Sequence, residues 1–192
     1  MIKRFIIVLG ILLGFMACYT QTLHEPNLEN FKIIAKKKAE YFSIYIKKIA
    51  SKTTNFSDKE LAIKQAVDLF IYDTVSVQVS YCPSSSKPVI YSRTLIKYLR
   101  RLSMLNYDRV EIDWVDVVMV EDLKKGADGN YYGIISTVQR FTGVKGDYIY
   151  TDVTQKHIEI VLKPYKKPND QGEEEWRWDV YLSNVNIVEP CS

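Results

Sequence analysis

Three groups of residues have the types and spacing that acid–base chemistry uses. They are Asp113 and Asp116 beside Trp114, Asp152 with Lys156, and His157 with Glu159. The sequence surrounds none of them with a phosphate-binding glycine loop, a nucleophile elbow or a set of metal ligands. An enzyme would need one of these carboxylates, or the histidine, at the floor of a pocket with a perturbed pKa.

A hairpin within residues 131–162 predicts a row of polar side chains on an otherwise apolar strand face. If Val144 pairs with Asp147 across a two-residue turn, Gln139 lies opposite Asp152 and shares its face with Lys156. Polar groups set into an apolar surface are typical of a ligand pocket. The alternative is a sheet whose outer half is exposed. The predicted ligand-binding residues are Trp114, Gln139, Asp152 and Lys156.

The histidine group is a poorer candidate. His157 and Glu159 alternate along the chain with Ile158 and Ile160, which places the two pairs on opposite strand faces. The isoleucines would take the core side, so the histidine and glutamate would face water. An exposed pair of this kind contributes little to stability or to catalysis.

The first twenty residues have the pattern of a secretory signal. Lys3 and Arg4 precede an apolar run at 5–17, which is short of the ~20 residues that a membrane-spanning helix needs. Two cleavage sites are open: a lipoprotein site that makes an acylated Cys18 the new N-terminus, and ordinary cleavage near Thr20 and Gln21. Both place the protein outside the cytoplasm. Residues 21–26 then form a polar tether, 27–189 one domain, and 190–192 a tail.

The predicted compartment changes what the cysteines suggest. Cleavage near Thr20 leaves Cys82 and Cys191, and an oxidising compartment favours a disulfide between them. The alternative is two unpaired thiols. Neither cysteine has a His or a second Cys at metal-ligand spacing, so we expect no zinc and no other cofactor.

Charge argues against nucleic acid as a partner. Lys3 and Arg4 account for two of the 26 basic residues, which leaves 24 basic against 23 acidic groups after the signal is removed. A nucleic-acid-binding domain would carry a strong basic excess. The partners we expect are an unknown small ligand or an envelope protein, with membrane attachment only through a lipid at Cys18.

The periodicity of apolar residues predicts helices at 27–50, 57–70 and 92–106, and strands at 75–79, 89–91, 110–120, 131–142, 148–162 and 175–188. Asn27 is the expected N-cap of the first helix, and Ser57 with Glu60 forms a predicted capping box for the second. We expect strand 110–120 to be covered on both sides, with Val118 and Val120 on the Trp114 face. Residues 164–174 are a predicted polar loop, and a phase change at Ser183 and Asn184 predicts a bulge.

The order helix, helix, strand pair, helix and four-stranded meander resembles the nuclear-transport-factor-two-like superfamily, which includes ketosteroid-isomerase-like and scytalone-dehydratase-like enzymes. The stretches that match are the helix at Ser57, strand 75–79, the YSRTLIKYLRRL segment from Tyr91 and the long strands after it. The resemblance implies an α+β fold in which a curved antiparallel sheet wraps around three N-terminal helices as a cone with a pocket. Another α+β fold of the cystatin type is the alternative. No catalytic residue of the superfamily can be placed on this sequence.

Two functions follow as hypotheses. The first is a non-catalytic extracytoplasmic protein that holds a small ligand or an envelope protein. It would use the cone pocket, or a sheet face rich in aromatic residues such as Trp114, Trp176 and Trp178. The second is a small isomerase, dehydratase or hydrolase with a pocket aspartate as its base. A carboxylate or histidine buried at the pocket floor favours the enzyme.

Overall fold

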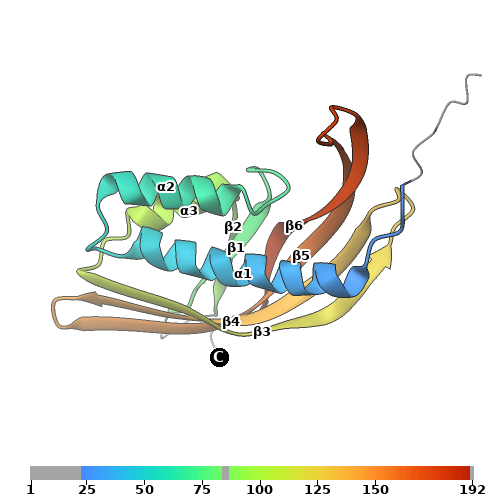
Figure 1. Cartoon of the computed structure of the whole chain (residues 1–192). Helices are drawn as coiled ribbons and strands as arrows, with labels where there is room; N and C mark the ends of the chain where they lie inside the picture. Colours follow the sequence, from blue (N-terminus) through green and yellow to red (C-terminus); the bar gives the residue numbers. More distant parts are fainter. Residues whose placement is uncertain (1–22, 84–86, 191–192) are drawn as a thin grey trace, which may run out of the picture.

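The computed structural model describes residues 23–83 and 87–190, and it places three helices against one face of a curved six-stranded sheet (Figure 1). The α+β class with a cone-like sheet is confirmed. The elements are α1 (Leu28–Ala50), α2 (Phe56–Val67), β1 (Ser76–Tyr81), β2 (Val89–Thr94), α3 (Leu95–Ser103), β3 (Arg109–Lys125), β4 (Tyr131–Lys145), β5 (Tyr148–Pro168) and β6 (Glu174–Glu189).

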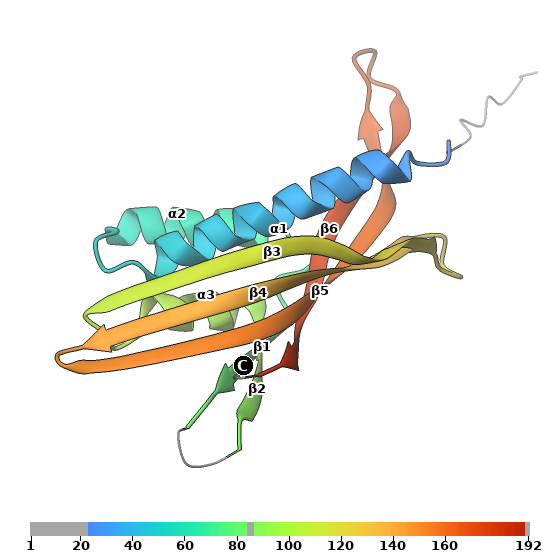
Figure 2. The same ribbon diagram turned by 90° about the horizontal axis from the view of Figure 1, so that it is seen from below.

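The sheet has the strand order β2-β1-β6-β5-β4-β3. Strands β3 to β6 form the predicted antiparallel meander, seen side by side in Figure 2. β1 pairs with β6 in the parallel sense, through Val77 and Val185, so the sheet is mixed rather than wholly antiparallel. The sheet does not close into a barrel, and the β1–β2 hairpin extends from its far edge.

α1 provides one layer of the core. Its buried stripe includes the small residues Ala35 and Ala39, which let the helix approach the sheet, and the large ring of Phe42. The Phe42 ring centroid lies 4.8 Å from that of Phe70 and 5.3 Å from that of Trp114, both in edge-to-face geometry. Such pairs add to the burial of apolar area, the main stabilising contribution to the fold.

The first helix begins as predicted and the second does not. Asn27 caps α1 by accepting a hydrogen bond from the Asn30 backbone amide. The cap of α2 is Asn55, whose Oδ1 accepts from the Asp58 amide at 2.8 Å. Ser57 therefore lies inside the first turn, and the predicted Ser57–Glu60 capping box is wrong. Asparagine is as good a cap as serine and comes two residues earlier.

The third helix also begins later than predicted, at Leu95 rather than Ser92. β2 continues through Thr94, because its backbone pairs with β1 along its whole length, from Tyr81 opposite Val89 to Ser76 opposite Thr94. Pairing across the sheet thus overrides the helical pattern of this segment.

Halfway along β3, a bulge changes which residues of the strand point toward the core. Asp116 has a positive φ of 55°, and the pairing with β4 shifts register around it. After this bulge Val117 packs against the core, whereas Val118 and Val120 are 46% and 48% exposed. The predictions that they share the Trp114 face, and that both faces of the strand are covered, are wrong, because a bulge reverses the alternation.

The last two strands are longer than predicted. β5 continues through Pro168, and its pairing with β6 runs through the predicted loop, for example Lys166 opposite Trp176. The loop at 164–174 therefore shortens to 169–173. The bulge predicted at Ser183 and Asn184 is confirmed: between the pairs Ile158–Val185 and Ile160–Leu182, one residue of β5 faces these two residues of β6.

The chain before α1 is attached to the sheet. The Trp178 Nε1 donates to the His24 carbonyl oxygen at 2.8 Å, and Glu25 pairs with Lys125 and accepts a hydrogen bond from Tyr131. Within residues 23–83 and 87–190, no helix has the length and apolar character needed to cross a membrane.

Candidate functional site

A cavity of about 280 Å³ lies between α3, the β1–β2 hairpin and the inner face of β3, β4 and β5. Six aromatic rings line it, from Tyr81, Tyr91, Tyr98, Tyr107, Phe141 and Tyr150. Three basic groups (Arg93, Arg101 and Lys156) and one acid (Asp152) lie among them. The cavity is at the lower end of the size range of small-molecule sites.

The polar row predicted from the β4–β5 hairpin forms part of this cavity. Gln139, Asp152 and Lys156 all line it. The hairpin register differs from the prediction, because Lys145 pairs with Tyr148 and Gln139 lies opposite Thr154 rather than Asp152. This slip is by two residues, and side chains alternate with period two, so every predicted residue keeps its face.

Trp114, the fourth predicted residue, borders the site without lining the cavity. Its Nε1 donates to the Gln139 Oε1 at 3.1 Å, which fixes the orientation of the amide. Its ring packs on Phe42 in the core. Trp114 therefore positions a cavity residue and is close enough to report on occupancy by fluorescence.

Lys156 is the most unusual side chain of the site. It is 2% exposed, and its Nζ reaches from β5 to donate to the backbone oxygen of Gln78 on β1 at 3.0 Å. Burial away from water lowers the pKa of Lys156 from its ordinary 10.5 to about 8, and the negative charge of Asp152 opposes this shift. At pH 7 roughly one tenth of this amine is uncharged, far more than for an ordinary lysine.

Asp152 belongs to a hydrogen-bonded polar cluster on the cavity wall. The Thr154 hydroxyl donates to Oδ1 at 2.9 Å, and the Ser80 hydroxyl donates to Oδ2 at 3.4 Å. Ser80 and Thr154 also lie 3.1 Å apart, so the cluster joins β1 to β5. The carboxylate is held in place by hydroxyl donors and is half-buried.

Three tyrosines of the cavity wall, Tyr98, Tyr107 and Tyr150, have raised pKa values. Tyr98 on α3 is 7% exposed, and burial raises its pKa well above the usual range. Burial also raises the pKa values of Tyr107 and Tyr150. These hydroxyls are therefore hydrogen-bond donors rather than phenolates at physiological pH.

Sequence reasoning missed the basic groups at the mouth. Like Lys97 and Arg100, they lie in a segment whose basic residues would ordinarily form a solvated helix face. The structure places Arg93 and Arg101 on the cavity lining. One available signal was the spacing of Tyr98 and Arg101, which at three residues apart share a side of the helix.

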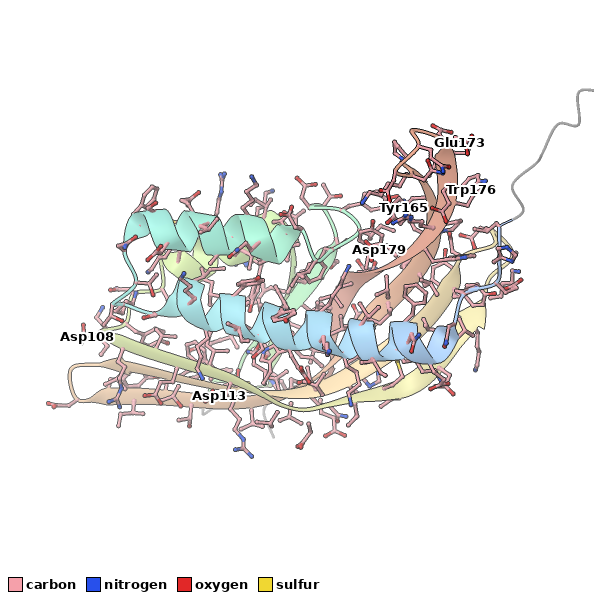
Figure 3. All side chains as sticks on the ribbon, in the orientation of Figure 1. Asp108, Asp113, Tyr165, Glu173, Trp176 and Asp179 are labelled. Atoms are coloured by element: carbon pink, nitrogen blue, oxygen red, sulfur yellow. The ribbon has the colours of Figure 1, made fainter. Side chains whose placement is uncertain are left out.

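The other acid–base candidates lie elsewhere. Asp113 pairs with Lys47 of α1 at 2.6 Å, and Asp116 is at the exposed bulge of β3. Glu159 accepts from the side-chain amides of Asn184 and Asn186, on the strand face opposite the cavity. Tyr165 and Trp176, both labelled in Figure 3, lie near the outer end of the β5–β6 hairpin, well away from α3.

The predictions about metals and cysteines concern residues that lie partly outside the described ranges. In the described ranges 23–83 and 87–190, no three His, Cys, Asp or Glu side chains are arranged to hold a metal ion. Cys82 follows β1, whereas Cys18 and Cys191 lie outside the described residues. Acylation of Cys18 and the Cys82–Cys191 disulfide remain predictions.

With the cone-like α+β fold established, the comparisons with known proteins give a distant likeness only. The sequence matches no protein-family model, and no curated protein shows significant sequence similarity. A crystal structure from Novosphingobium aromaticivorans DSM 12444, provisionally assigned as a scytalone dehydratase, is similar with a TM-score of 0.39 and 9% identity. The match covers 85% of this chain and 91% of the other. A likeness of this size carries no functional argument.

Proposed function

We propose that the cavity binds a small, mainly apolar, ring-containing molecule that carries a negative charge, and that the protein is an extracytoplasmic ligand-binding protein. The observation that carries the proposal is the composition of the cavity: six aromatic rings around three basic groups and one acid. We also propose that the chain is a member of the nuclear-transport-factor-two-like superfamily, which its order of elements resembles.

The aromatic wall suits a flat ring. Tyr107 and Phe141 stand edge-to-face at 5.8 Å between centroids, and Phe141 and Tyr150 are tilted at 5.9 Å. A ring enclosed by such side chains gains from apolar burial and from edge-to-face contacts. Three tyrosine hydroxyls that stay protonated offer donors to an oxygen on the same molecule.

The basic groups of the cavity favour a negatively charged ligand. Arg93 and Arg101 each present a planar guanidinium that can bind a carboxylate through two hydrogen bonds. Lys156 lies deeper, where a bound anion would replace lost solvation. Against the single carboxylate of Asp152, the local charge favours an anion.

The test is a titration of the protein with 2-naphthoate and with its uncharged counterpart 2-naphthalenemethanol, followed by tryptophan fluorescence. A charge-assisted hydrogen bond contributes roughly 1.5–3 kcal/mol, so the naphthoate should bind about tenfold more tightly or better. Equal affinities would remove the anionic part of the proposal. Absence of saturable binding by either compound would remove the proposal itself.

A neighbouring pair of arginines supplies matched variants. Arg101→Gln removes a cation from the cavity lining, whereas Arg100→Gln removes the same charge from the next position of α3, outside the lining. Only the first substitution should weaken binding of 2-naphthoate, and neither should affect 2-naphthalenemethanol. Equal losses in both variants would mean that net charge, and not the cavity, attracts the ligand.

The extracytoplasmic setting rests on the signal-like pattern of the first twenty residues. Mass spectrometry of the protein isolated from its cells decides the form of the N-terminus: an acylated Cys18, or an unmodified start after Thr20. A non-reducing mass measurement with alkylation decides the disulfide, because two alkylatable thiols at Cys82 and Cys191 would exclude it.

A small enzyme with Asp152 as its base is the second candidate. One observation favours it: the carboxylate is held on the cavity wall by Ser80 and Thr154, where a bound molecule could touch it. An enzyme of this kind should speed the exchange of α-protons of 1-indanone in deuterated water, and Asp152→Asn should abolish the effect. Exchange no faster than in buffer would refute this candidate.

A further inference from the structure

We propose that Lys156 is a nucleophilic amine that forms an imine with aldehydes or ketones entering the cavity. The proposal rests on the proposed function, since it requires that a small ring-containing molecule can enter. It assigns to the site a chemical class of ligand, carbonyl compounds, and a covalent mode of capture.

The geometry favours a neutral amine at this position. Lys156 is 2% exposed and lines the cavity. In the described part of the chain, Nζ has one hydrogen-bond acceptor, the carbonyl oxygen of Gln78. An ammonium has three donors and would leave two of them unused away from water, whereas a neutral amine leaves one. The neutral form also has a lone pair, the electron pair that attacks a carbonyl carbon.

The charged groups around the amine act in both directions. Asp152 on β5 favours the ammonium, whereas Arg93 on β2 and Arg101 on α3 are the other charged side chains of the cavity lining. Burial raises the pKa of Tyr98, which faces the cavity from α3 and stays neutral. Desolvation outweighs the carboxylate, and the pKa of about 8 leaves on the order of a hundredfold more free amine near neutral pH than an ordinary lysine has.

The reaction is balanced without any further reagent. The Nζ lone pair forms a bond to the carbonyl carbon, and the π electrons of the carbonyl move onto oxygen. The two amine protons leave with that oxygen as water, through Asp152 or solvent, and the nitrogen lone pair then completes the carbon–nitrogen double bond. The aromatic wall holds the ring of the carbonyl compound beside Nζ, and the enclosed site limits hydrolysis of the product.

The experiment treats the folded protein with a limiting amount of 2-naphthaldehyde and sodium cyanoborohydride, which reduces an imine to a stable secondary amine. Peptide mass analysis then gives the label on every lysine. We expect Lys156 to be labelled at least tenfold faster than exposed lysines such as Lys97 and Lys145. Its rate should rise with pH through the pKa of about 8, where half of the amine is neutral, and level off at higher pH.

Two controls link the label to the cavity. Leu105→Trp fills part of the cavity, and Leu61→Trp makes the same change at an exposed position of α2. The first should protect Lys156 and the second should not, while Lys97 is labelled in both. Excess 2-naphthoate, which lacks a reactive carbonyl, should also protect Lys156 in the unaltered protein.

Three results would overturn the proposal in distinguishable ways. If exposed lysines are labelled while Lys156 is spared, and 2-naphthoate still binds saturably, the imine is refuted and the binding function stands. If Lys156 is spared and 2-naphthoate does not bind, both fail. Labelling of Lys156 that Leu105→Trp leaves unchanged would also contradict entry through the cavity.

Discussion

Replacing Lys156 by methionine should change how the stability of the protein depends on pH. The pKa of this amine falls from 10.5 to about 8 on folding because burial removes its solvation. The folded protein therefore loses the proton first, and the unfolded chain binds more protons between about pH 8 and pH 10.5. Stability consequently rises with pH across this window, through the contribution of this one group.

The magnitude follows from linkage. Between about pH 7 and pH 9.5 the buried amine should add about 2 kcal/mol to the free energy of unfolding, most of it above pH 8. Methionine has a similar length and no charge, so Lys156→Met lacks this increment at every pH. The difference in stability between the two proteins should therefore shift by about 2 kcal/mol in favour of the lysine form as pH rises.

Urea unfolding followed by tryptophan fluorescence measures the difference at several pH values. Lys145→Met, on the exposed end of β4, is the matched control and should run parallel to the unaltered protein. Asp152→Asn removes the charge that favours the ammonium, so it should move the rise to lower pH. Parallel curves for Lys156→Met and the unaltered protein would refute the perturbed amine.

Three further predictions concern the cap of α2, the cavity wall and the helix–sheet core. Asn55→Ala should lower the free energy of unfolding in urea by about 1 kcal/mol, whereas Ser57→Ala should leave it nearly unchanged, because Asn55 is the cap of α2. A larger loss for Ser57→Ala would show that Ser57 is the cap instead. Gly143→Ala should weaken 2-naphthoate binding measured by fluorescence, because the new methyl carbon would lie 2.7 Å from the Tyr107 ring of the cavity wall; unchanged affinity would mean that the ring is not a ligand contact. Phe42→Ala should cost about 3–5 kcal/mol, and a smaller loss would show that the helix–sheet core can collapse around the gap.

The sequence was sufficient for the fold class and for much of the cavity floor. Period-two alternation placed Gln139, Asp152 and Lys156 on one face, and this survived an error in the turn because the slip was by an even number of residues. The bulge at Ser183 was also visible, since the apolar phase changes there.

The remainder of the site depends on long-range contacts that periodicity does not encode. Arg101 looks like any outward-facing helix residue until α3 is laid across the sheet. The bulge at Asp116 was hidden because valines occupy both faces of β3, so a change of phase leaves no trace in the pattern. The burial of Lys156 depends on β1, one of whose two partner strands, β6, comes more than one hundred residues later in the chain.

The parallel contact between β1 and β6 has a consequence for how the protein folds. The Ser76 amide donates to Asn184 and the Ile187 amide to Gln78, contacts that join segments separated by 108 and 109 residues. Closing loops of this length is slow and entropically costly, whereas the β3–β6 hairpins are local. We expect the meander to form first and the pairing of β1 with β6 over Lys156 last, so that refolding protein regains most of its β-sheet circular-dichroism signal before it regains the ability to hold a ligand.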